Sequence, residues 1–396
     1  MSDLPDPSAV VGSDADAIVV GGGLVGVAAA IAIAKTGLQV IHLAPQGPVD
    51  NRTSALMMPS VQFLRSAGLI DEPETLGHRL SEIRIIDATD RLIRAPETLF
   101  EARESGLEAF GWNFANQRLL AQFRDRAAQL PNLETRPIGV AEFAYGANGP
   151  ELTLADGSRL RAPLIVGADG KKSLIRSAAG FRARENGFTQ AALVCDLELA
   201  RPIGGMSVEF HYPQGPFTLV PAGDNRANLV WIDDREVLRE AQASGAERLL
   251  PIFQAKSQHL FGVITLATPA HVFPLSTLSV ERAGARGVVL VGEAAHAFPP
   301  IGAQGLNLGL RDVADLAAVL QGVNTGNQGW GEAVSEAYSE RRAADLARTG
   351  GMVDALFRSL LADMLPAQAV RSAGLWALKL LPGLRRQAFS LGMGIR

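Results

Sequence analysis

Apolar positions along the chain follow two different periods. Short, continuous runs rich in Val, Ile and Leu predict buried strands of a parallel sheet. These runs occupy residues 17–20, 39–43, 164–167 and 287–292. Helical spacing of apolar residues predicts helices over 61–67, 117–130, 173–179, 305–320 and 331–361. Because strands and helices alternate, the pattern indicates an α/β fold.

A period of two replaces these patterns in the middle of the chain. Apolar and polar residues alternate over 192–199, 206–212, 217–221, 227–232 and 272–275, and a helix at 235–258 interrupts them. Two other alternating segments predict strand pairs, 80–95 with a turn at Thr89–Asp90 and 138–162 with a turn at 155–158. We therefore expect an antiparallel sheet domain inserted into the α/β chain.

The composition is that of a globular chain with a large core. Of the 396 residues, 47% are hydrophobic, and the net charge of −4 gives no basic footprint for nucleic acid. The single cysteine, Cys195, excludes an internal disulfide and fits a reducing cytoplasm. The six histidines show no metal-ligand spacing, and no run reaches the roughly 20 apolar residues of a membrane span. Four Asp and no Lys or Arg in the first 16 residues are unlike a signal peptide.

The first chemical signal is a glycine-rich turn between the first strand and an alanine-rich helix. Gly21, Gly23 and Gly26 have the spacing G-x-G-x-x-G, which allows a tight turn, the approach of a pyrophosphate, and close packing of helix on strand. The N–H groups of the helix N-terminus favour phosphate. The second strand ends at Ala44, where dinucleotide folds usually carry an acid for a ribose hydroxyl. A glycine turn of another α/β unit is the alternative.

Two further motifs follow the later strands. One contains Gly167, Asp169, Gly170, Ser173 and Arg176; the other contains Gly292, Glu293, His296, Pro299, Pro300, Gln304, Gly305, Leu306 and Asn307. Taken alone, Asp169 is explained as a turn residue and Arg176 as a surface ion pair. His296 alone is explained as a packed histidine in a loop. The order and separation of all three motifs require a joint explanation.

Together the three motifs resemble those of the class A flavoprotein aromatic hydroxylases, which have the fold of p-hydroxybenzoate hydroxylase. Within that family the chain is most similar to the ubiquinone-biosynthesis hydroxylases, through Arg52-x-Ser54-Ala55-Leu56 and through Asn116 at a helix start. The resemblance implies an α/β fold: an FAD-binding Rossmann-like (GR2-type) domain, an inserted mixed or antiparallel β-sheet substrate domain, and a C-terminal helical region. The implied boundaries are 15–80, 97–186 and 276–350 for the FAD-binding domain, 81–96 and 187–275 for the substrate domain, and 351–396 for the helical region.

The resemblance also implies which residues bind the cofactor. Arg52 lies near the pyrophosphate, and Glu293 replaces the Asp that accepts hydrogen bonds from ribityl or ribose hydroxyls. The helix that opens at Gln304 directs N–H groups at the flavin. The implied cofactor-binding set is Gly21, Gly23, Gly26, Arg52, Asn116, Asp169, Gly170, Arg176, Gly292, Glu293, Gln304, Gly305, Leu306 and Asn307. Pro299, Pro300 and His296 are implied to lie beside the flavin, and neither a catalytic base nor a metal site is assigned.

The implied activity is hydroxylation of an aromatic ring of a (poly)prenylated phenol in ubiquinone biosynthesis. NAD(P)H reduces FAD, which reacts with O₂ to give a C4a-hydroperoxide that transfers oxygen to the ring. Alternatives are a hydroxylase of a soluble phenol, a flavin-dependent prenyl reductase, and a non-catalytic scaffold of a biosynthetic complex. Residues 352–396 carry six Lys/Arg against two Asp. This segment either contacts a membrane surface or partner enzyme, or packs on the main body. The expected location is cytoplasmic, or peripheral at the inner membrane.

Overall fold

A computed structural model describes residues 13–89, 94–147, 149–300 and 303–361, with side chains described as far as residue 351. The expected membrane or partner contact of residues 352–396 therefore lies outside the described side chains. The predicted turn residue Asp90 also lies outside the described residues.

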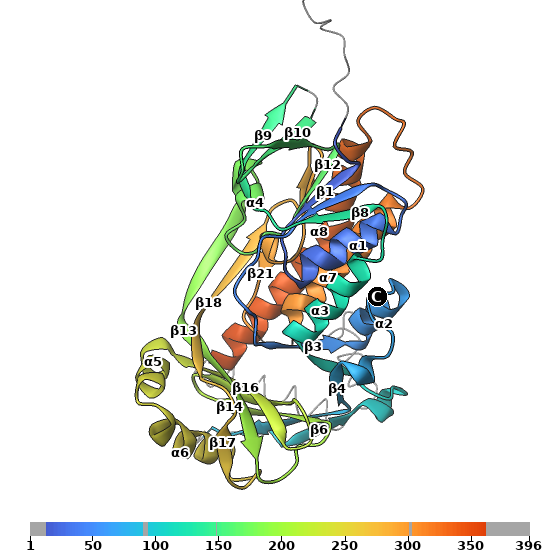
Figure 1. Ribbon diagram of the computed structural model, residues 1–396. Coiled ribbons are helices and arrows are strands. Elements are labelled where there is room, and N and C mark those ends of the chain that lie inside the picture. Colours follow the sequence, from blue (N-terminus) through green and yellow to red (C-terminus); the bar gives the residue numbers. More distant parts are fainter. Residues whose placement is uncertain (1–12, 90–93, 148, 301–302, 362–396) are drawn as a thin grey trace, which may run out of the picture.

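The four predicted buried strands lie side by side in one sheet, called here the parallel sheet. Within the described residues its order is β19-β20-β12-β1-β2-β8, and the neighbours from β20 to β8 are parallel. The strands are β1 (Ala17–Val20), β2 (Val40–Leu43), β8 (Leu133–Arg136), β12 (Leu164–Gly167), β19 (Gly284–Ala285) and β20 (Val288–Leu290). Helix α1 (Leu24–Ala34) packs between α3 (Asn116–Ala127) and α7 (Gln304–Leu320) (Figure 1). The α/β prediction is confirmed.

The prediction of a strand pair within 80–95 was wrong in its detail, because β5 (Glu82–Asp87) lies in that segment but its partner β6 (Thr98–Glu101) follows it. These two strands and the period-two segments between residues 192 and 275 form a second sheet, called here the large sheet. Within the described residues its order is β21-β18-β13-β16-β15-β14-β5-β6, with β17 paired to β13. Its strands are β5 (Glu82–Asp87), β6 (Thr98–Glu101), β13 (Ala183–Leu199), β14 (Met206–Tyr212), β15 (Gly215–Pro221), β16 (Arg226–Asp234), β17 (Ile264–Leu266), β18 (His271–Val280) and β21 (His296–Ala297). Strands β13 and β18 run continuously across residues 187 and 275. The domain boundaries at those positions stay a prediction.

The helix predicted over 235–258 is two helices, so that prediction was wrong in its detail. Helix α5 (Arg235–Ala243) ends before Gly245, whose positive φ of 73° breaks the helical path, and α6 (Ala246–Lys256) starts directly afterwards. Both cover the outer face of the large sheet, where Phe253 of α6 meets Phe217 and Trp231.

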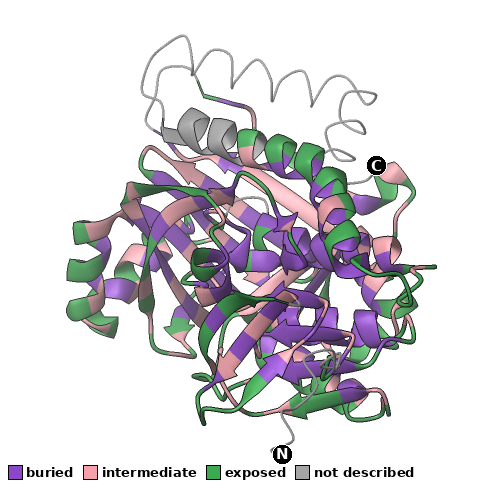
Figure 2. Cartoon of the chain, turned by 90° about the horizontal axis from the view of Figure 1, so that it is seen from above, coloured by how far each residue is buried: buried purple, intermediate pink, exposed green. Residues whose placement is uncertain are grey.

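Two smaller sheets complete the described fold. Strands β3 (Thr53–Met57), β7 (Gly111–Ala115) and β4 (Gly77–Leu80) form one, with helix α2 (Met58–Ser66) after β3. The predicted strand pair at 138–162 is three strands, because β9 (Val140–Gly146) turns into β10 (Gly149–Leu154) before β11 (Arg159–Arg161). Helices α4 (Leu174–Ala178) and α8 (Trp330–Leu361) are the remaining α-helices of the described residues. Figure 2 shows buried residues filling the interior, with exposed residues along outer helix faces and loops.

Candidate functional site

One large cavity joins the parallel sheet to the large sheet. It has a volume of about 1580 Å³. The glycine-rich turn, strand β3 and the start of α7 line one part, and the inner face of the large sheet lines the other. The three sequence motifs therefore meet in one cavity although they are far apart along the chain.

The glycine-rich turn has the shape that a pyrophosphate requires. A Cβ on Gly21, whose φ is +133°, would lie 2.2 Å from the carbonyl oxygen of Ala168, and a Cβ on Gly26 would lie 2.0 Å from that of Gly21. At Gly23, by contrast, a Cβ would meet nothing within 4 Å, so the backbone faces open space. Helix α1 starts there without a side-chain cap or an acid in its first turn. Its N–H groups are therefore available to an anion.

A second helix N-terminus faces the same cavity. Helix α7 also begins without a side-chain cap or a first-turn acid, and Gln304, Gly305 and Leu306 line the cavity. Asn307 lies behind them and is not among the lining residues. Its Nδ2 donates to the carbonyl of Ala55 at 2.9 Å, and its Oδ1 accepts from the N–H of Met57 at 2.9 Å. Asn307 therefore fixes the start of α7 against β3.

A cluster of polar side chains forms another part of the cavity wall. Asp50 binds the Arg52 guanidinium through both carboxylate oxygens, at 2.7 and 2.9 Å, and accepts from Asn116 Nδ2 at 2.9 Å. Burial alone would raise the pKa of the Asp50 carboxyl, but Arg52 and Asn116 hold it below its usual range. Asp50 and, more weakly, Glu293 raise the pKa of Arg52. Glu293 is exposed to the cavity, where its carboxylate is available to hydroxyl groups.

The second motif lines the cavity with Asp169 and Gly170 and supports it from behind with Arg176. Asp169 lines the cavity, but its carboxylate accepts from Ser173 Oγ at 2.5 Å and from the N–H of Ile175 at 3.1 Å. Arg176 is buried and is not a lining residue. Its guanidinium donates to the carbonyls of Ala294 at 3.0 Å and Lys171 at 2.7 Å, which ties the second motif to the third.

Among the residues expected beside the flavin, only Pro300 lines the cavity. Pro299 is buried outside the lining. His296 is also buried outside it, where its Nε2 lies 2.6 Å from Asp312 Oδ2. His296 therefore matches the interpretation of a packed histidine.

Sequence reasoning missed most of the polar residues in the sheet-facing part of the cavity. Asp196, Asn228, Glu209 and Asn113 all line it, although neither a motif nor a spacing assigns any of them a role in the site. Arg124 of α3 also lines the cavity, and its charge contributes to the lowered pKa of His42, which precedes Ala44 by two residues. These residues come from separate elements, so only the folded chain brings them together.

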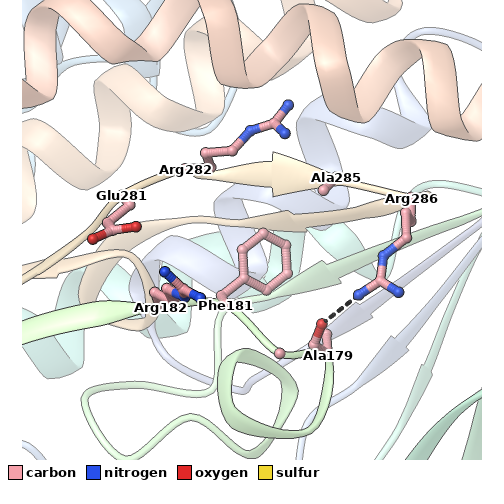
Figure 3. Close-up of a pocket in the computed structure, with 8 residues that line it drawn as sticks. Ala179, Phe181, Arg182, Glu281, Arg282, Ala285 and Arg286 are labelled. Carbon is pink, nitrogen blue, oxygen red and sulfur yellow. Dashed lines mark hydrogen bonds between the residues drawn. The ribbon is translucent and has the colours of Figure 1, made fainter.

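A smaller hollow of about 210 Å³ lies beyond the end of α4, directly after the second motif (Figure 3). Arg182, Arg282 and Arg286 line it together with Glu281. Arg286 donates to the carbonyl of Ala179 at 2.9 Å, and Arg282 pairs with Glu336 of α8. None of the predicted site residues lies here.

Comparison with known proteins agrees with this geometry. A family model described as an FAD binding domain matches residues 14–349, and the chain belongs to this family, whose cofactor is FAD. The chain is similar to ubiquinone hydroxylase UbiL of Rhodospirillum rubrum, with 31% identity over 96% of this chain and 90% of the relative. It is also 29% identical to 3-demethoxyubiquinol 3-hydroxylase of Escherichia coli, over 95% of this chain and 98% of the relative.

The fold is shared with solved flavoprotein structures. The crystal structure of p-nitrophenol 4-monooxygenase PnpA from Pseudomonas putida matches with a TM-score of 0.77 and 19% identity, over 96% of this chain and 98% of that one. Of the helices in the described part of the chain, none has the length and apolar character needed to cross a membrane.

Proposed function

We propose that this chain is an FAD-dependent monooxygenase that hydroxylates the aromatic ring of a prenylated phenol in ubiquinone biosynthesis, with NAD(P)H and O₂ as co-substrates. The observation that carries the proposal is the single cavity that joins a dinucleotide-type turn to the inner face of the large sheet. Similarity to ubiquinone hydroxylases over nearly the whole chain supports the substrate class.

The residues present fit FAD. The α1 N-terminus and the open backbone at Gly23 would hold the pyrophosphate, and Arg52 and Glu293 would contact the charged and hydroxyl groups nearby. The uncapped start of α7 would stabilise negative charge on the ring system. FAD, when bound, supplies the hydride-accepting and oxygen-transferring chemistry.

The large sheet would supply the substrate surface. Val194, Val220, Val230 and Leu275 give this part of the cavity an apolar floor that excludes water from a bound ring. Phe273 lines the cavity and is 41% exposed, so it adds apolar surface that a ligand can contact. An apolar surface of this kind suits a ring that carries a prenyl chain.

The test is to purify the protein, record its visible spectrum with added FAD, and measure NAD(P)H oxidation with a prenylated phenol. We expect a bound-flavin spectrum, bleaching by NAD(P)H, and a hydroxylated product detected by mass spectrometry. Failure to bind FAD would contradict the proposal and favour the scaffold alternative. Flavin reduction with no hydroxylated product from any phenol would instead favour the reductase.

A Gly23→Ala variant separates cofactor binding from folding. Its Cβ meets no protein atom within 4 Å, and the φ of −79° suits alanine, so the fold should be unaffected. The same Cβ would occupy the space that a pyrophosphate needs. We expect unchanged thermal unfolding of the apoprotein and a fall in FAD affinity of at least about tenfold, which corresponds to about 1.4 kcal/mol.

A further inference from the structure

Two carboxylates that line the cavity project from the large sheet. Asp196 belongs to β13 and Glu209 to β14, and both stand among the apolar side chains of the cavity floor. A carboxylate in such a place needs hydrogen-bond donors, because burial of an uncompensated charge is costly. The two acids differ in how this need is met.

Asp196 is held by a hydrogen-bond network of amide and hydroxyl groups. Asn228 Nδ2 donates to Asp196 Oδ1, while Asn228 Oδ1 accepts from Thr53 Oγ1 at 2.8 Å and from Asn113 Nδ2 at 2.6 Å. These two donors fix which end of the Asn228 amide faces the acid. The backbone N–H of Asp196 also donates to Thr268 Oγ1 at 2.9 Å. The carboxylate is therefore oriented before any ligand arrives.

One acceptor atom of this network lacks a partner at the cavity surface. Asp196 lines the cavity, and its Oδ2 accepts no hydrogen bond within the described residues. A carboxylate oxygen among apolar side chains is stabilised by a hydrogen-bond donor, which a ligand hydroxyl would supply. The second unpartnered atom, Asn113 Oδ1, is closed off from the cavity by protein atoms.

We propose that Asp196, oriented by Asn228, accepts the phenolic hydroxyl of the aromatic substrate. This inference rests on the function proposed above. The substrate O–H donates to Asp196 Oδ2. As the ring is attacked, this O–H bond breaks and an O–H bond forms on Asp196. The electron pair of the broken bond stays on the substrate oxygen, where it stabilises the loss of electron density from the ring. Because a carboxylate is a weaker base than a phenolate, the proton moves during attack rather than on binding.

Glu209 is in a different position. Its Oε2 lies 3.3 Å from Nε2 of His211 on the same strand. Strands β16 and β15 separate β13 from β14, and at ~4.8 Å per strand spacing the two acids stand roughly 14 Å apart across the sheet. One hydroxyl cannot contact both. Glu209 is therefore the matched control for Asp196, and Asn228 is a positioning residue.

The test uses 4-nitrophenol, a phenol whose colour reports its ionisation, bound to the FAD-loaded protein. Asp196 as an anion favours the neutral, hydrogen-bonded form of the probe. We therefore expect wild type and Glu209→Gln to suppress the yellow phenolate colour on binding. In Asp196→Asn the bound ratio of phenolate to phenol should rise about tenfold or more, because a nearby like charge has been removed. Asn228→Ala should shift the ratio in the same direction by less.

A purely structural role for Asp196 would lower the melting temperature without changing the spectrum of the bound probe. An unchanged ratio in Asp196→Asn, a change produced by Glu209→Gln instead, or no binding of the probe by wild type would each overturn the assignment. Flavin reduction by NAD(P)H, measured on the same samples, reports on the proposed function separately. If the wild-type flavin were not reduced by NAD(P)H, the proposed monooxygenase activity would be contradicted, whereas the spectrum of the bound probe would still test the contact between Asp196 and the hydroxyl group.

Discussion

Replacement of Asp312 by alanine is expected to destabilise the protein by about 3–5 kcal/mol, the usual range when one member of a buried ion pair is removed. Asp312 is 1% exposed. Its Oδ2 accepts from the Gly292 N–H at 2.9 Å and lies 2.6 Å from His296 Nε2, and its Oδ1 accepts from Arg342 Nε at 2.8 Å. Burial alone would lower the pKa of Arg342, but Asp312 and its neighbours raise it above the usual range.

Asp312→Asn tests the same reasoning more finely. Asparagine can keep an oxygen toward Arg342, but the Nδ2 that replaces Oδ2 cannot accept from the Gly292 N–H. Leaving one buried N–H unpaired costs about 1–3 kcal/mol, less than the alanine variant. Because Gly292 precedes Glu293 in the cavity wall, FAD affinity should fall in both variants.

The assay is urea unfolding of the apoprotein followed by circular dichroism, with FAD affinity from flavin fluorescence. Glu336→Gln is the control, because Glu336 pairs with Arg282 at the surface, where the side chains are 39% and 57% exposed. That change should cost only about 0–1 kcal/mol. An Asp312→Ala variant within about 1 kcal/mol of wild type would refute the idea that this buried carboxylate holds the third motif in place.

Three further outcomes follow from the contacts around the cavity. Gly26→Ala should abolish soluble, FAD-binding protein, because its Cβ would lie 2.0 Å from the Gly21 carbonyl oxygen; a normal flavin spectrum from this variant would contradict the turn geometry. Burial lowers the pKa of His42 below its usual 6.5, so the unfolded state takes up its proton first and stability should fall as pH drops below about 6.5. Thermal melts at pH 7.5 and 5.5 should show a smaller loss for His42→Gln, whose amide can still donate to Gly21; equal losses would count against this assignment. Asp50→Asn should weaken FAD binding several-fold in fluorescence titrations, because Arg52 loses its carboxylate partner, and an unchanged Kd would show that this pair does not position the cofactor.

The parts of the fold that depend on residues adjacent in the sequence could be predicted from the sequence. The strand, turn and helix around Gly21, Gly23 and Gly26 were recognisable because glycine spacing and apolar runs report local backbone geometry. The same holds for the period-two strands of the large sheet. Local signals were weaker at Gly245, where one glycine divides an otherwise helical segment. They were also weaker at β3 and β7, because these two paired strands are far apart in the sequence.

The sequence and the tertiary structure determine different parts of the site. Sequence alone identified the three motifs that line or support one end of the cavity, because each motif is a short segment with its own geometry. Tertiary structure decided that His296 faces Asp312 and that Arg176 binds backbone carbonyls rather than the cavity. It also brought Thr53 to Asn228, which lies 175 residues further along the chain. Side-chain partners of this kind are set by which elements pack together, and no pattern within a single segment contains that information.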